Sequence, residues 1–441
     1  MLVGEEEEIL SRVGKGTPLG ELLRRYWTPA CLSSELERDG APLEVRLLGE
    51  DLVAFRDTDG RTGLLGRHCP HRGASIFYGR NEECGLRCVY HGWKFDVAGR
   101  CVDMPSEPRP FAERIRATSY PTHESGGIVW AYMGPPETMT PFRDFGSDSL
   151  GPKDTLAWKV RWECNWLQAL EGNLDTAHIS HLHQYFGASD LPEDGSDRPG
   201  YPSTAWAWKA WWLDRAPRVD VQDEWYGFRY AGIRRTPNGF RYVRVSAFTM
   251  PYATVIPKIP YDTLQIFVVP IDDDANWRYV LRTQLGPEPL GGPRPDLPYV
   301  SVGRQEGVLE RDYRADNLYQ LDRELQKVTF SGIRDFMSQD MAVTESMGPM
   351  YDRRKEHLGT TDLAIVRARR LLVDAARALA RGGTPPGLPG QGDFRTIRSA
   401  EKVLSEGEDW RVLGTDDDPA VRDAERTRDR ARAWGGVAPP A

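Results

Sequence analysis

The 441-residue sequence has few cysteines and no long hydrophobic run. Six cysteines in a chain of this length are too few for a disulfide framework, so we expect reduced thiols or metal ligands. No run of about eighteen apolar residues occurs, so no transmembrane helix is expected. The N-terminal Met-Leu-Val-Gly, followed by four glutamates, lacks the basic and apolar regions of a signal peptide. We therefore predict a cytoplasmic protein without a membrane partner.

The sequence also lacks an excess of positive charge and a nucleotide-binding motif. The chain has 57 lysines and arginines against 65 aspartates and glutamates, which leaves a net charge of -8. This balance argues against a nucleic-acid partner. No glycine-rich nucleotide-binding motif is present, so we do not expect a nicotinamide or a flavin on this chain. The length and the 40% of hydrophobic residues allow two domains, each with its own core.

Two pairs of cysteine and histidine stand out from this ordinary composition. Cys69-Pro-His71 is followed, after sixteen intervening residues, by Cys88-Val-Tyr-His91. Two thiolates on one iron and two imidazoles on the other are the ligands of a Rieske [2Fe-2S] cluster, which transfers single electrons. Zinc is the alternative, because cysteine and histidine also suit a tetrahedral zinc site. The order of the ligands, with Gly73 and Gly92 after the two pairs, favours the cluster.

A second candidate metal site lies near the middle of the chain, where three of the eight histidines fall within six residues. Two imidazoles and one carboxylate form the facial triad of non-haem Fe(II) oxygenases. On a regular helix His178 and His181 share a face, whereas His183 is about 140° from His178, so spacing alone favours His181. Asp175, three residues before His178, is placed to orient its imidazole. Candidates for the carboxylate ligand are Asp335, Asp340, Glu345 and Asp352.

The two sites and their flanking residues resemble one family, the Rieske non-haem iron aromatic-ring oxygenases. The first loop reads Cys-Pro-His-Arg-Gly and the second Cys-Val-Tyr-His-Gly-Trp-Lys-Phe. The resemblance covers residues 17–372, and segments 338–349 and 358–372 are similar to the homomeric group of phthalate 4,5-dioxygenase type, which includes phenoxybenzoate dioxygenase-like enzymes.

The resemblance implies a role for each motif residue. Cys69, His71, Cys88 and His91 would bind the [2Fe-2S] cluster, and His178, His183 and Asp340 would bind a mononuclear Fe(II). In the family, the residue that matches Asp175 bridges a cluster histidine of one subunit and an iron-bound histidine of the next. The path expected here is His91, Asp175 and His178. It requires a head-to-tail ring, so we expect a homotrimer or stacked trimers.

The expected fold class is α+β. We predict an N-terminal segment (1–25), an all-β Rieske domain (26–154), a catalytic α+β domain with an antiparallel, helix-grip-like sheet (155–381), and a peripheral or partly disordered tail (382–441). Alternating patterns and turn residues predict the local elements. We expect strands at 43–48, 52–55 and 127–132 and within 206–271, a linker at 141–155, and helices at 165–183, 321–347 and 362–380.

The activity implied by the resemblance is that of the terminal oxygenase component of a multicomponent system in aromatic hydrocarbon catabolism. A separate reductase, with NAD(P)H, a flavin and a plant-type [2Fe-2S] centre, would supply electrons, and O2 would hydroxylate an aromatic substrate. Dioxygenation, monooxygenation, O-demethylation and ether cleavage remain open, since the triad serves all of them. The alternative of another class is an electron carrier or redox sensor whose second domain no longer binds iron.

One predicted strand offers a hint about the substrate. In residues 242–250, period two places Arg244, Phe248 and Met250 on one face. A guanidinium beside apolar side chains would suit an aromatic carboxylate, because arginine binds carboxylates bidentately. The alternative is that the intervening valines face the core and Arg244 faces solvent.

Overall fold

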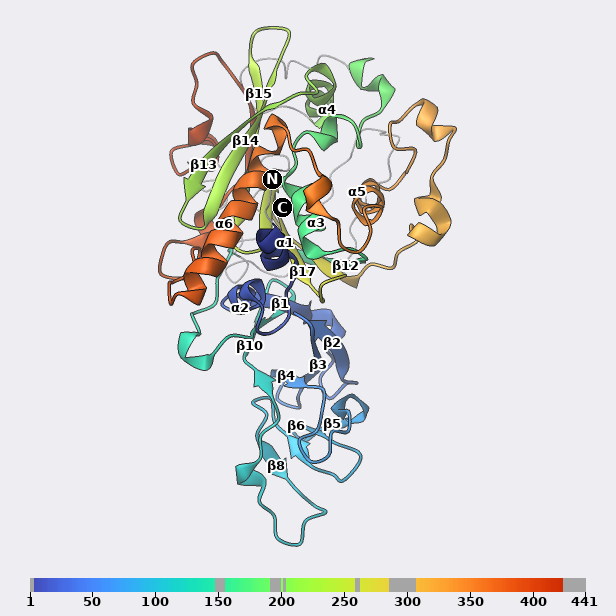
Figure 1. The fold of residues 1–441 in the computed structure, drawn as a ribbon, viewed down its shortest axis with the longest axis vertical. Coiled ribbons are helices and arrows are strands. Elements are labelled where there is room, and N and C mark those ends of the chain that lie inside the picture. Colours follow the sequence, from blue (N-terminus) through green and yellow to red (C-terminus); the bar gives the residue numbers. More distant parts are fainter. Residues whose placement is uncertain are drawn as a thin grey trace, which may run out of the picture.

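The computed structural model describes residues 4–146, 155–190, 200, 204–257, 262–284 and 307–422. The chain has a narrow part and a wide part, with most of the blue and cyan residues below and most green to red residues, together with the dark-blue helices α1 and α2, above (Figure 1). The strands next to the two cysteine–histidine loops lie at the far end of the narrow part, away from helices α3 and α5. In the described residues no helix is long and apolar enough to cross a membrane.

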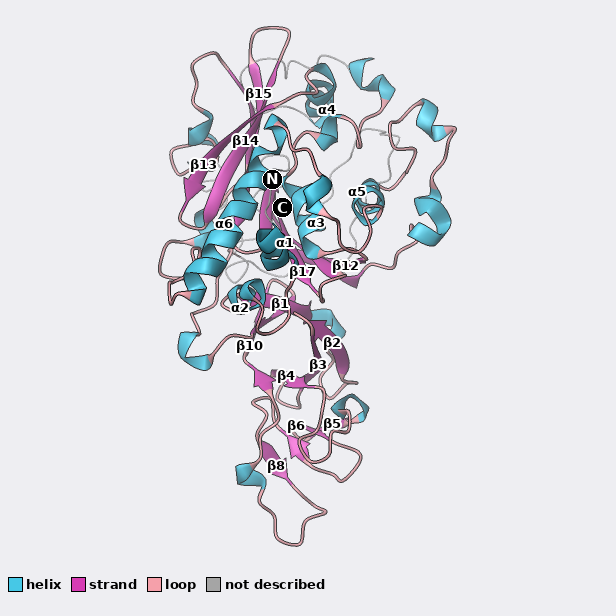
Figure 2. Ribbon diagram, in the orientation of Figure 1, coloured by secondary structure: helices cyan, strands magenta, loops and turns pink. Residues whose placement is uncertain are grey.

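The narrow part contains three small antiparallel sheets (Figure 2). The predicted strands at 43–48, 52–55 and 127–132 correspond to β2, β3 and β11. The strands, sheet by sheet, are β1 (Trp27–Leu32), β11 (Ile128–Tyr132) and β10 (Thr122–Ser125); β2 (Leu43–Leu47), β3 (Glu50–Arg56), β4 (Thr62–Gly66) and β9 (Ser119–Tyr120); and β5 (Arg80–Glu82), β6 (Gly85–Arg87), β7 (Lys94–Phe95) and β8 (Cys101–Asp103). The expected all-β character is confirmed.

The wide part is built on a nine-stranded sheet with the order β13-β14-β15-β16-β17-β18-β12-β19, in which β20 also pairs with β15. All pairs are antiparallel except β12 with β19. The α+β fold class is therefore confirmed. The strands are β12 (Thr155–Trp162), β13 (Arg218–Glu224), β14 (Gly227–Arg235), β15 (Arg241–Thr249), β16 (Ala253–Pro257), β17 (Asp262–Pro270), β18 (Asn276–Gln284), β19 (Gly307–Val308) and β20 (Ala400–Leu404).

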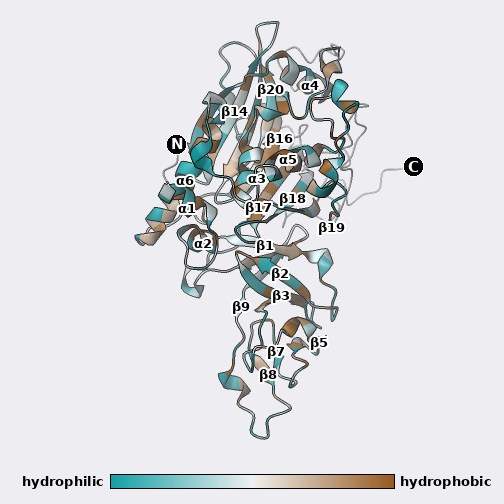
Figure 3. Cartoon of the chain, turned by 45° about the vertical axis from the view of Figure 1, so that its right-hand side comes forward, coloured by the Kyte–Doolittle hydropathy of each residue, from teal (hydrophilic) through white to brown (hydrophobic). Residues whose placement is uncertain are grey.

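Helices cover one face of this sheet. They are α1 (Gly4–Ser11), α2 (Pro18–Leu23), α3 (Trp166–Leu174), α4 (Thr204–Leu213), α5 (Phe336–Glu345) and α6 (Leu363–Ala380). Helices α3 and α6 contact β13, β16 and β17, and the N-terminal helices α1 and α2 pack on α6. Brown, hydrophobic residues gather around β16, α3 and α5, whereas α6 presents teal residues outward (Figure 3). Residues 4–23 thus belong to the wide part.

Three predictions about helices need correction. The predicted helix 165–183 is only α3, and the predicted helix 321–347 is only α5, preceded by short 3-10 turns. Within 206–271, where strands were expected, the residues up to Leu213 belong to helix α4. The cause lies in local side-chain capping: Asp335 accepts the amide of Ser338 at 2.7 Å and so starts α5 late. The predicted helix 362–380 is confirmed as α6, with Asp362 at its N-cap.

The segment after Gly382 is not the peripheral tail that its composition suggested. Strand β20 pairs with β15 over five residues, from Ala400 with Val245 to Leu404 with Arg241. Trp410 and Leu413 lie buried against the valines of β15, and Trp410 Nε1 donates to Asp220 at 2.9 Å. These apolar contacts between residues distant in sequence explain why local charge and proline content failed to predict the packing. Residues 423–441 lie outside the described part.

A buried ion-pair cluster ties α3 to α6. Glu171 of α3 lies between Arg369, whose Nε donates to Oε1 at 2.7 Å, and Arg353, whose Nη2 is 3.3 Å from Oε2. Both arginines are buried, and Arg369 also pairs with Glu356. Buried charges are costly unless they are paired, so this cluster fixes α3 relative to α6. The C-terminal end of α3, where the second candidate site begins, is thereby held in place.

Candidate active site

The two cysteine–histidine loops have the same backbone turn. The amide of Gly73 donates to the carbonyl of Cys69 at 2.9 Å, and the amide of Gly92 donates to the carbonyl of Cys88 at 3.0 Å. Both glycines have a φ of 76°, in the left-handed region where a side chain is strained. A Cβ at Gly92 would also lie 2.6 Å from Pro105 Cγ. The turn chemistry therefore requires the glycines that the motif contains.

The two loops face each other across a small hollow. The ring centroids of His71 and His91 are 4.4 Å apart, and His71 stacks on Trp93. Cys69 and Cys88 are buried, and burial raises the pKa of the Cys69 thiol. Two buried sulfurs beside two partly exposed imidazoles fit the donor set of a Rieske cluster. The hollow is lined by Cys69, His71, Arg72, Ala74, Cys88, Tyr90, His91 and Trp93.

The second candidate site begins where α3 ends. Asp175 is the C-cap residue, and its Oδ1 accepts the backbone amide of Ala177 at 2.6 Å. This local hydrogen bond competes with the helix, and a short 3-10 turn, His178–Ser180, follows. The angular argument that favoured His181 fails because His178 and His183 do not share one helix.

Three of the predicted ligands converge at this break. The rings of His178 and His183 are 5.0 Å apart, and Oδ1 of Asp340, from α5, is 3.0 Å from His183 Nε2 and 3.5 Å from His178 Nε2. The three ligand atoms lie within 4.8 Å of one another. Nε2 of His183 is buried, and the Asp340 carboxylate is the group that it faces. Two imidazole nitrogens that converge on one carboxylate fit a 2-His-1-carboxylate iron site.

The other candidates have different surroundings. His181 packs edge-on against Phe330. Asp335 caps α5, Glu345 accepts the guanidinium of Arg311, and Asp352 accepts the amide of Arg354. Of the four carboxylates considered from the sequence, Asp340 is the one that meets the two histidines.

Neighbouring charges shift the pKa values of Asp340 and His178, two of the candidate ligands. Burial raises the pKa of Asp340, but His183, His178 and Arg278 outweigh it and lower the pKa to about 2. Arg278 Nη1 is 3.8 Å from Asp340 Oδ2. Burial lowers the pKa of His178, but the carboxylate of Asp175, 3.6 Å from Nδ1, outweighs it and raises the pKa above its usual value. The Asp340 carboxylate is therefore ionised near neutral pH, as a metal ligand must be.

His183 is fixed from behind by Gln339. Gln339 Nε2 donates to the carbonyl of Ile333 at 2.7 Å, so its Oε1 is the acceptor that lies 2.7 Å from His183 Nδ1. Nδ1 therefore carries the proton, and Nε2 is left free to bind a metal. Phe336 stacks on the other side of the ring, 3.7 Å between centroids. The tautomer and the orientation of His183 are both set by α5.

Replacing Gln339 by leucine should weaken iron retention because it removes the acceptor that fixes the His183 tautomer. Loss of such an outer partner typically costs about 10–100-fold in metal affinity. The measurement is the dissociation constant for Fe(II) after chelation and anaerobic reloading, with the visible spectrum of the Rieske cluster as internal control. Gln339→Glu keeps an acceptor for Nδ1 and should retain more iron than Gln339→Leu. Equal iron affinity in the wild type and Gln339→Leu would contradict this role.

Arg234 of β14 holds the loop that carries His178. Its Nη2 donates to the carbonyl of Thr176 at 2.6 Å and to Ser180 Oγ at 3.1 Å. Burial lowers the pKa of Arg234 to about 10. A Cβ at Gly232 would lie 2.6 Å from Thr176 Oγ1, so the missing side chain lets the loop approach the strand. The loop is thus fixed by contacts with the sheet.

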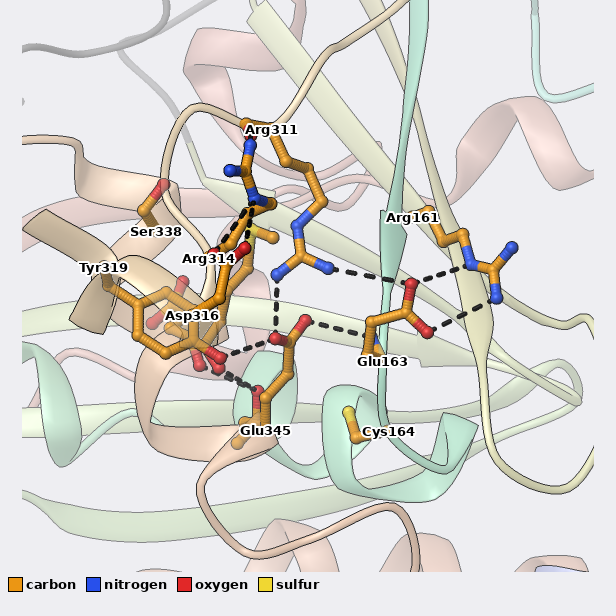
Figure 4. A network of polar contacts seen from close by, with 12 residues as sticks. Arg161, Glu163, Cys164, Arg311, Arg314, Asp316, Tyr319, Ser338 and Glu345 are labelled. Carbon is orange, nitrogen blue, oxygen red and sulfur yellow. Dashed lines mark hydrogen bonds and ion pairs between the residues drawn. The ribbon is translucent and has the colours of Figure 1, made fainter.

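A polar network supports the C-terminal end of α5 (Figure 4). Glu345 accepts Arg311 Nη2 at 2.7 Å, the hydroxyl of Tyr319 at 2.6 Å and the backbone amide of Glu163 at 2.9 Å. Arg311 also reaches the carboxylate of Glu163, 3.9 Å away, at the end of β12. The network joins three segments around the helix that carries Asp340.

The three predicted substrate residues do not lie together in the structure. Arg244 faces the helix-covered side of the sheet, partly buried, and the solvent-facing alternative is wrong. Phe248 packs against Phe228, and Met250 lies beside Gly387; both are completely buried in the main core. Six residues of strand span about 20 Å, so Met250 is remote from Arg244 although the two share a face. The structure thus places Phe248 and Met250 in the core.

Sequence reasoning missed several residues of the site. Gln339 directly precedes Asp340, so the motif carried a usable signal for it. Arg234 and Arg278 gave no such signal, because their roles depend on which strands pair and on how α3 and α5 lie over the sheet.

Comparisons with known proteins match both parts of the chain. The profile of the Rieske [2Fe-2S] domain matches residues 26–121, and that described as LigXa C-terminal domain like matches residues 131–431. The phthalate 4,5-dioxygenase oxygenase subunit of Pseudomonas putida is 39% identical, over 93% of this chain and 94% of its own. The 3-chlorobenzoate-3,4-dioxygenase oxygenase subunit of Comamonas testosteroni is 37% identical, over 93% and 97%. A crystal structure of dicamba monooxygenase has a TM-score of 0.55 at 18% identity, covering 81% of this chain and 99% of that one.

A Rieske domain joined to an α+β domain with a His-His-Asp cluster defines a class of enzyme, the Rieske-type oxygenases. The chain belongs to the Rieske non-haem iron aromatic-ring oxygenases, in the phthalate 4,5-dioxygenase-like group. It is the terminal oxygenase component of a multicomponent system, and the carrier alternative is wrong. Its cofactors are those of the family: a Rieske [2Fe-2S] cluster and a mononuclear iron, with O2 as co-substrate and electrons from a reductase.

Proposed function

We propose that this chain oxygenates an aromatic carboxylate at an iron held by His178, His183 and Asp340. The observation that carries the proposal is the convergence of these three ligands, with Arg244 close enough to lower the pKa of His178. An Fe(II) bound there supplies open coordination positions for O2 chemistry. The protein holds the three ligands ionised or in the correct tautomer and orients the substrate.

Arg244 supports an acidic substrate. Its guanidinium has no carboxylate within ion-pair distance among the described residues. Its hydrogen bond is a long one of 3.5 Å from Nη2 to the carbonyl of Pro257, and Nε is buried without a partner. The ring of Trp211 lies 6.0 Å from the guanidinium carbon. A partly buried guanidinium without a carboxylate partner is under-satisfied, and an anionic ligand would pair with it.

Replacing Arg244 by alanine should raise the apparent KM for an acidic substrate about 10–100-fold, the range expected for losing a charge-assisted hydrogen bond. Iron content should stay unchanged, because Arg244 is not a ligand. The matched control is Arg235→Ala, since the Arg235 side chain is 92% exposed on the neighbouring strand. An unchanged KM in Arg244→Ala would remove Arg244 from the substrate site.

We further propose a head-to-tail homotrimer, or stacked trimers, in which electrons pass from His91 of one subunit through Asp175 to His178 of the next. Two observations support this path. The cluster loops and α3 lie far apart within one chain (Figure 1). Tyr90, next to His91, is 55% exposed and Val89 is 58% exposed, so an apolar surface surrounds the cluster for a neighbour to cover. We propose that the reductase carries NAD(P)H, a flavin and a plant-type [2Fe-2S] centre.

The proposed activity is tested by substrate-dependent O2 uptake with product identification. The anaerobically reduced holoenzyme is mixed with O2 and a panel of benzoates, phthalates, aryl ethers and neutral arenes. One oxygenated or demethylated acid formed in proportion to O2 consumed would support the proposal. Turnover of a neutral arene alone would overturn the carboxylate assignment and leave the oxygenase. Dihydrodiol, phenol or O-demethylated products distinguish dioxygenation, monooxygenation and O-demethylation.

A further inference from the structure

A chain of buried hydrogen bonds lies beside Arg244. Trp211 Nε1 donates to the hydroxyl oxygen of Tyr242 at 3.2 Å, and that hydroxyl donates to Glu401 Oε2 at 2.8 Å. Tyr242 is completely buried and Glu401 is 8% exposed. The three residues come from α4, β15 and β20, so the fold assembles the chain from segments that are distant in sequence.

Glu401 is the direct cross-strand neighbour of Arg244. The two residues are paired in the antiparallel register of β15 and β20. Cross-strand neighbours of opposite charge usually attract, with side chains about 5 Å apart at Cβ. Yet the described structure contains no ion pair between them, and Glu401 is instead bonded to Tyr242. The carboxyl group of the residue paired with Arg244 is therefore hydrogen-bonded to another side chain.

The charges around this carboxyl are few. Burial raises the pKa of Glu401, and Arg244 and Tyr242 act in the opposite direction without overcoming it. Arg234, across from Tyr242 on β14, is committed to Thr176 and Ser180. Glu401 thus feels the charge of Arg244 but forms no ion pair with it within the described residues.

We propose that Glu401 is a specificity-determining residue, which Tyr242 holds away from Arg244 so that the guanidinium remains free for a substrate carboxylate. The proposal rests on the proposed role of Arg244 as the carboxylate anchor. It assigns a function to the C-terminal segment, because β20 supplies a carboxyl that would compete with the substrate if it were released. Selectivity for acids then depends on how much more strongly Arg244 binds the substrate carboxylate than it binds the carboxylate of Glu401.

Tyr242→Phe is the decisive variant, because it removes the hydroxyl that holds Glu401 and adds no bulk. The released carboxylate should pair with Arg244 and weaken acid binding about tenfold. Benzoate, 3-chlorobenzoate and phthalate are the probes, each compared with its carboxamide by titration calorimetry on the reduced holoenzyme. The fully amidated forms (benzamide, 3-chlorobenzamide and the diamide phthalamide) carry no charge, so their affinity should not change. Tyr252→Phe, which removes another buried hydroxyl, is the control for stability.

The double variant Tyr242→Phe with Glu401→Gln separates this role from a structural one. A glutamine cannot carry the competing charge, so acid affinity should return to within about twofold of the wild type. Glu401→Gln alone should bind acids as tightly as the wild type or up to about fivefold tighter. Weakening of acid and amide together, or no rescue in the double variant, would overturn the proposal.

Failure of this proposal is distinguishable from failure of the proposed function. If Arg244→Ala leaves the ratio of acid to amide affinity unchanged, the carboxylate anchor itself is wrong, and the role of Glu401 falls with it. If Arg244→Ala removes acid selectivity but Tyr242→Phe keeps it, the anchor stands and only the role of Glu401 is wrong.

Discussion

Asp340→Asn is expected to abolish product formation while leaving the Rieske cluster intact. The amide is a weaker metal ligand than the carboxylate, which is ionised in the site because its pKa is about 2. Total iron should fall from about three to about two atoms per chain, with the cluster's two iron atoms retained. Coupled turnover should drop on the order of 10³-fold or more, since the loss of the metal's contribution of several kcal/mol acts directly on the barrier.

The measurements for Asp340→Asn are iron and acid-labile sulfide analysis, the visible spectrum of the cluster, and O2 uptake coupled to product. Asp352→Asn is the matched control, because Asp352 was another candidate ligand and asparagine can still accept the amide of Arg354. Full iron content in Asp340→Asn, with normal turnover, would exclude Asp340 as a ligand.

Mixed assemblies of two inactive subunits are expected to recover activity. His91→Ala removes a cluster ligand and leaves the iron site, whereas Asp340→Asn removes an iron ligand and leaves the cluster. Neither variant alone can complete electron transfer. Purification through two different affinity tags selects trimers that contain both variants, and in a head-to-tail trimer of this kind an intact cluster precedes an intact iron site at about one of the three junctions. Activity of about a third of the wild type should therefore appear in the selected assemblies.

Substitution of Asp175 in one subunit at a time tests the direction of electron transfer in these mixed assemblies. In the proposed path the bridging carboxylate lies beside His178 of the subunit that receives the electron. Asp175→Asn placed in the His91→Ala subunit should remove the recovered activity, whereas the same change in the Asp340→Asn subunit should have no effect. The asparagine oxygen can still accept the amide of Ala177, so the turn should persist. No recovery in any mixture would mean that electrons do not cross between subunits.

Much of the metal chemistry could be predicted from the sequence because it depends on short motifs. Cys69, His71, Cys88 and His91 lie in two turns of identical geometry, and each turn is encoded by its own glycine. His178 and His183 are also local, but the helix break that brings them together comes from Asp175, whose capping a regular helix would not predict. The family resemblance pointed to His183, which lies in one cluster with His178 and Asp340, where spacing alone preferred His181.

The remaining parts were decided by tertiary structure. Asp340 could not be selected from four carboxylates by spacing, because its approach to His183 depends on how α5 packs over the sheet. Phe248 shares a face with Arg244, yet twist and strand length carry it into the core.

The C-terminal segment shows most clearly the difference between what the local sequence determines and what tertiary structure decides. By itself, the sequence determined which residues can bind the cluster and which local turns hold them, because those preferences are set within a few residues. It did not determine that Glu401 pairs in register with Arg244, because burial of β20 is stabilised by contacts with β14 and β15 that lie far away along the chain. Long-range apolar burial and strand register exist only in the folded chain, and they place the charges around the substrate site.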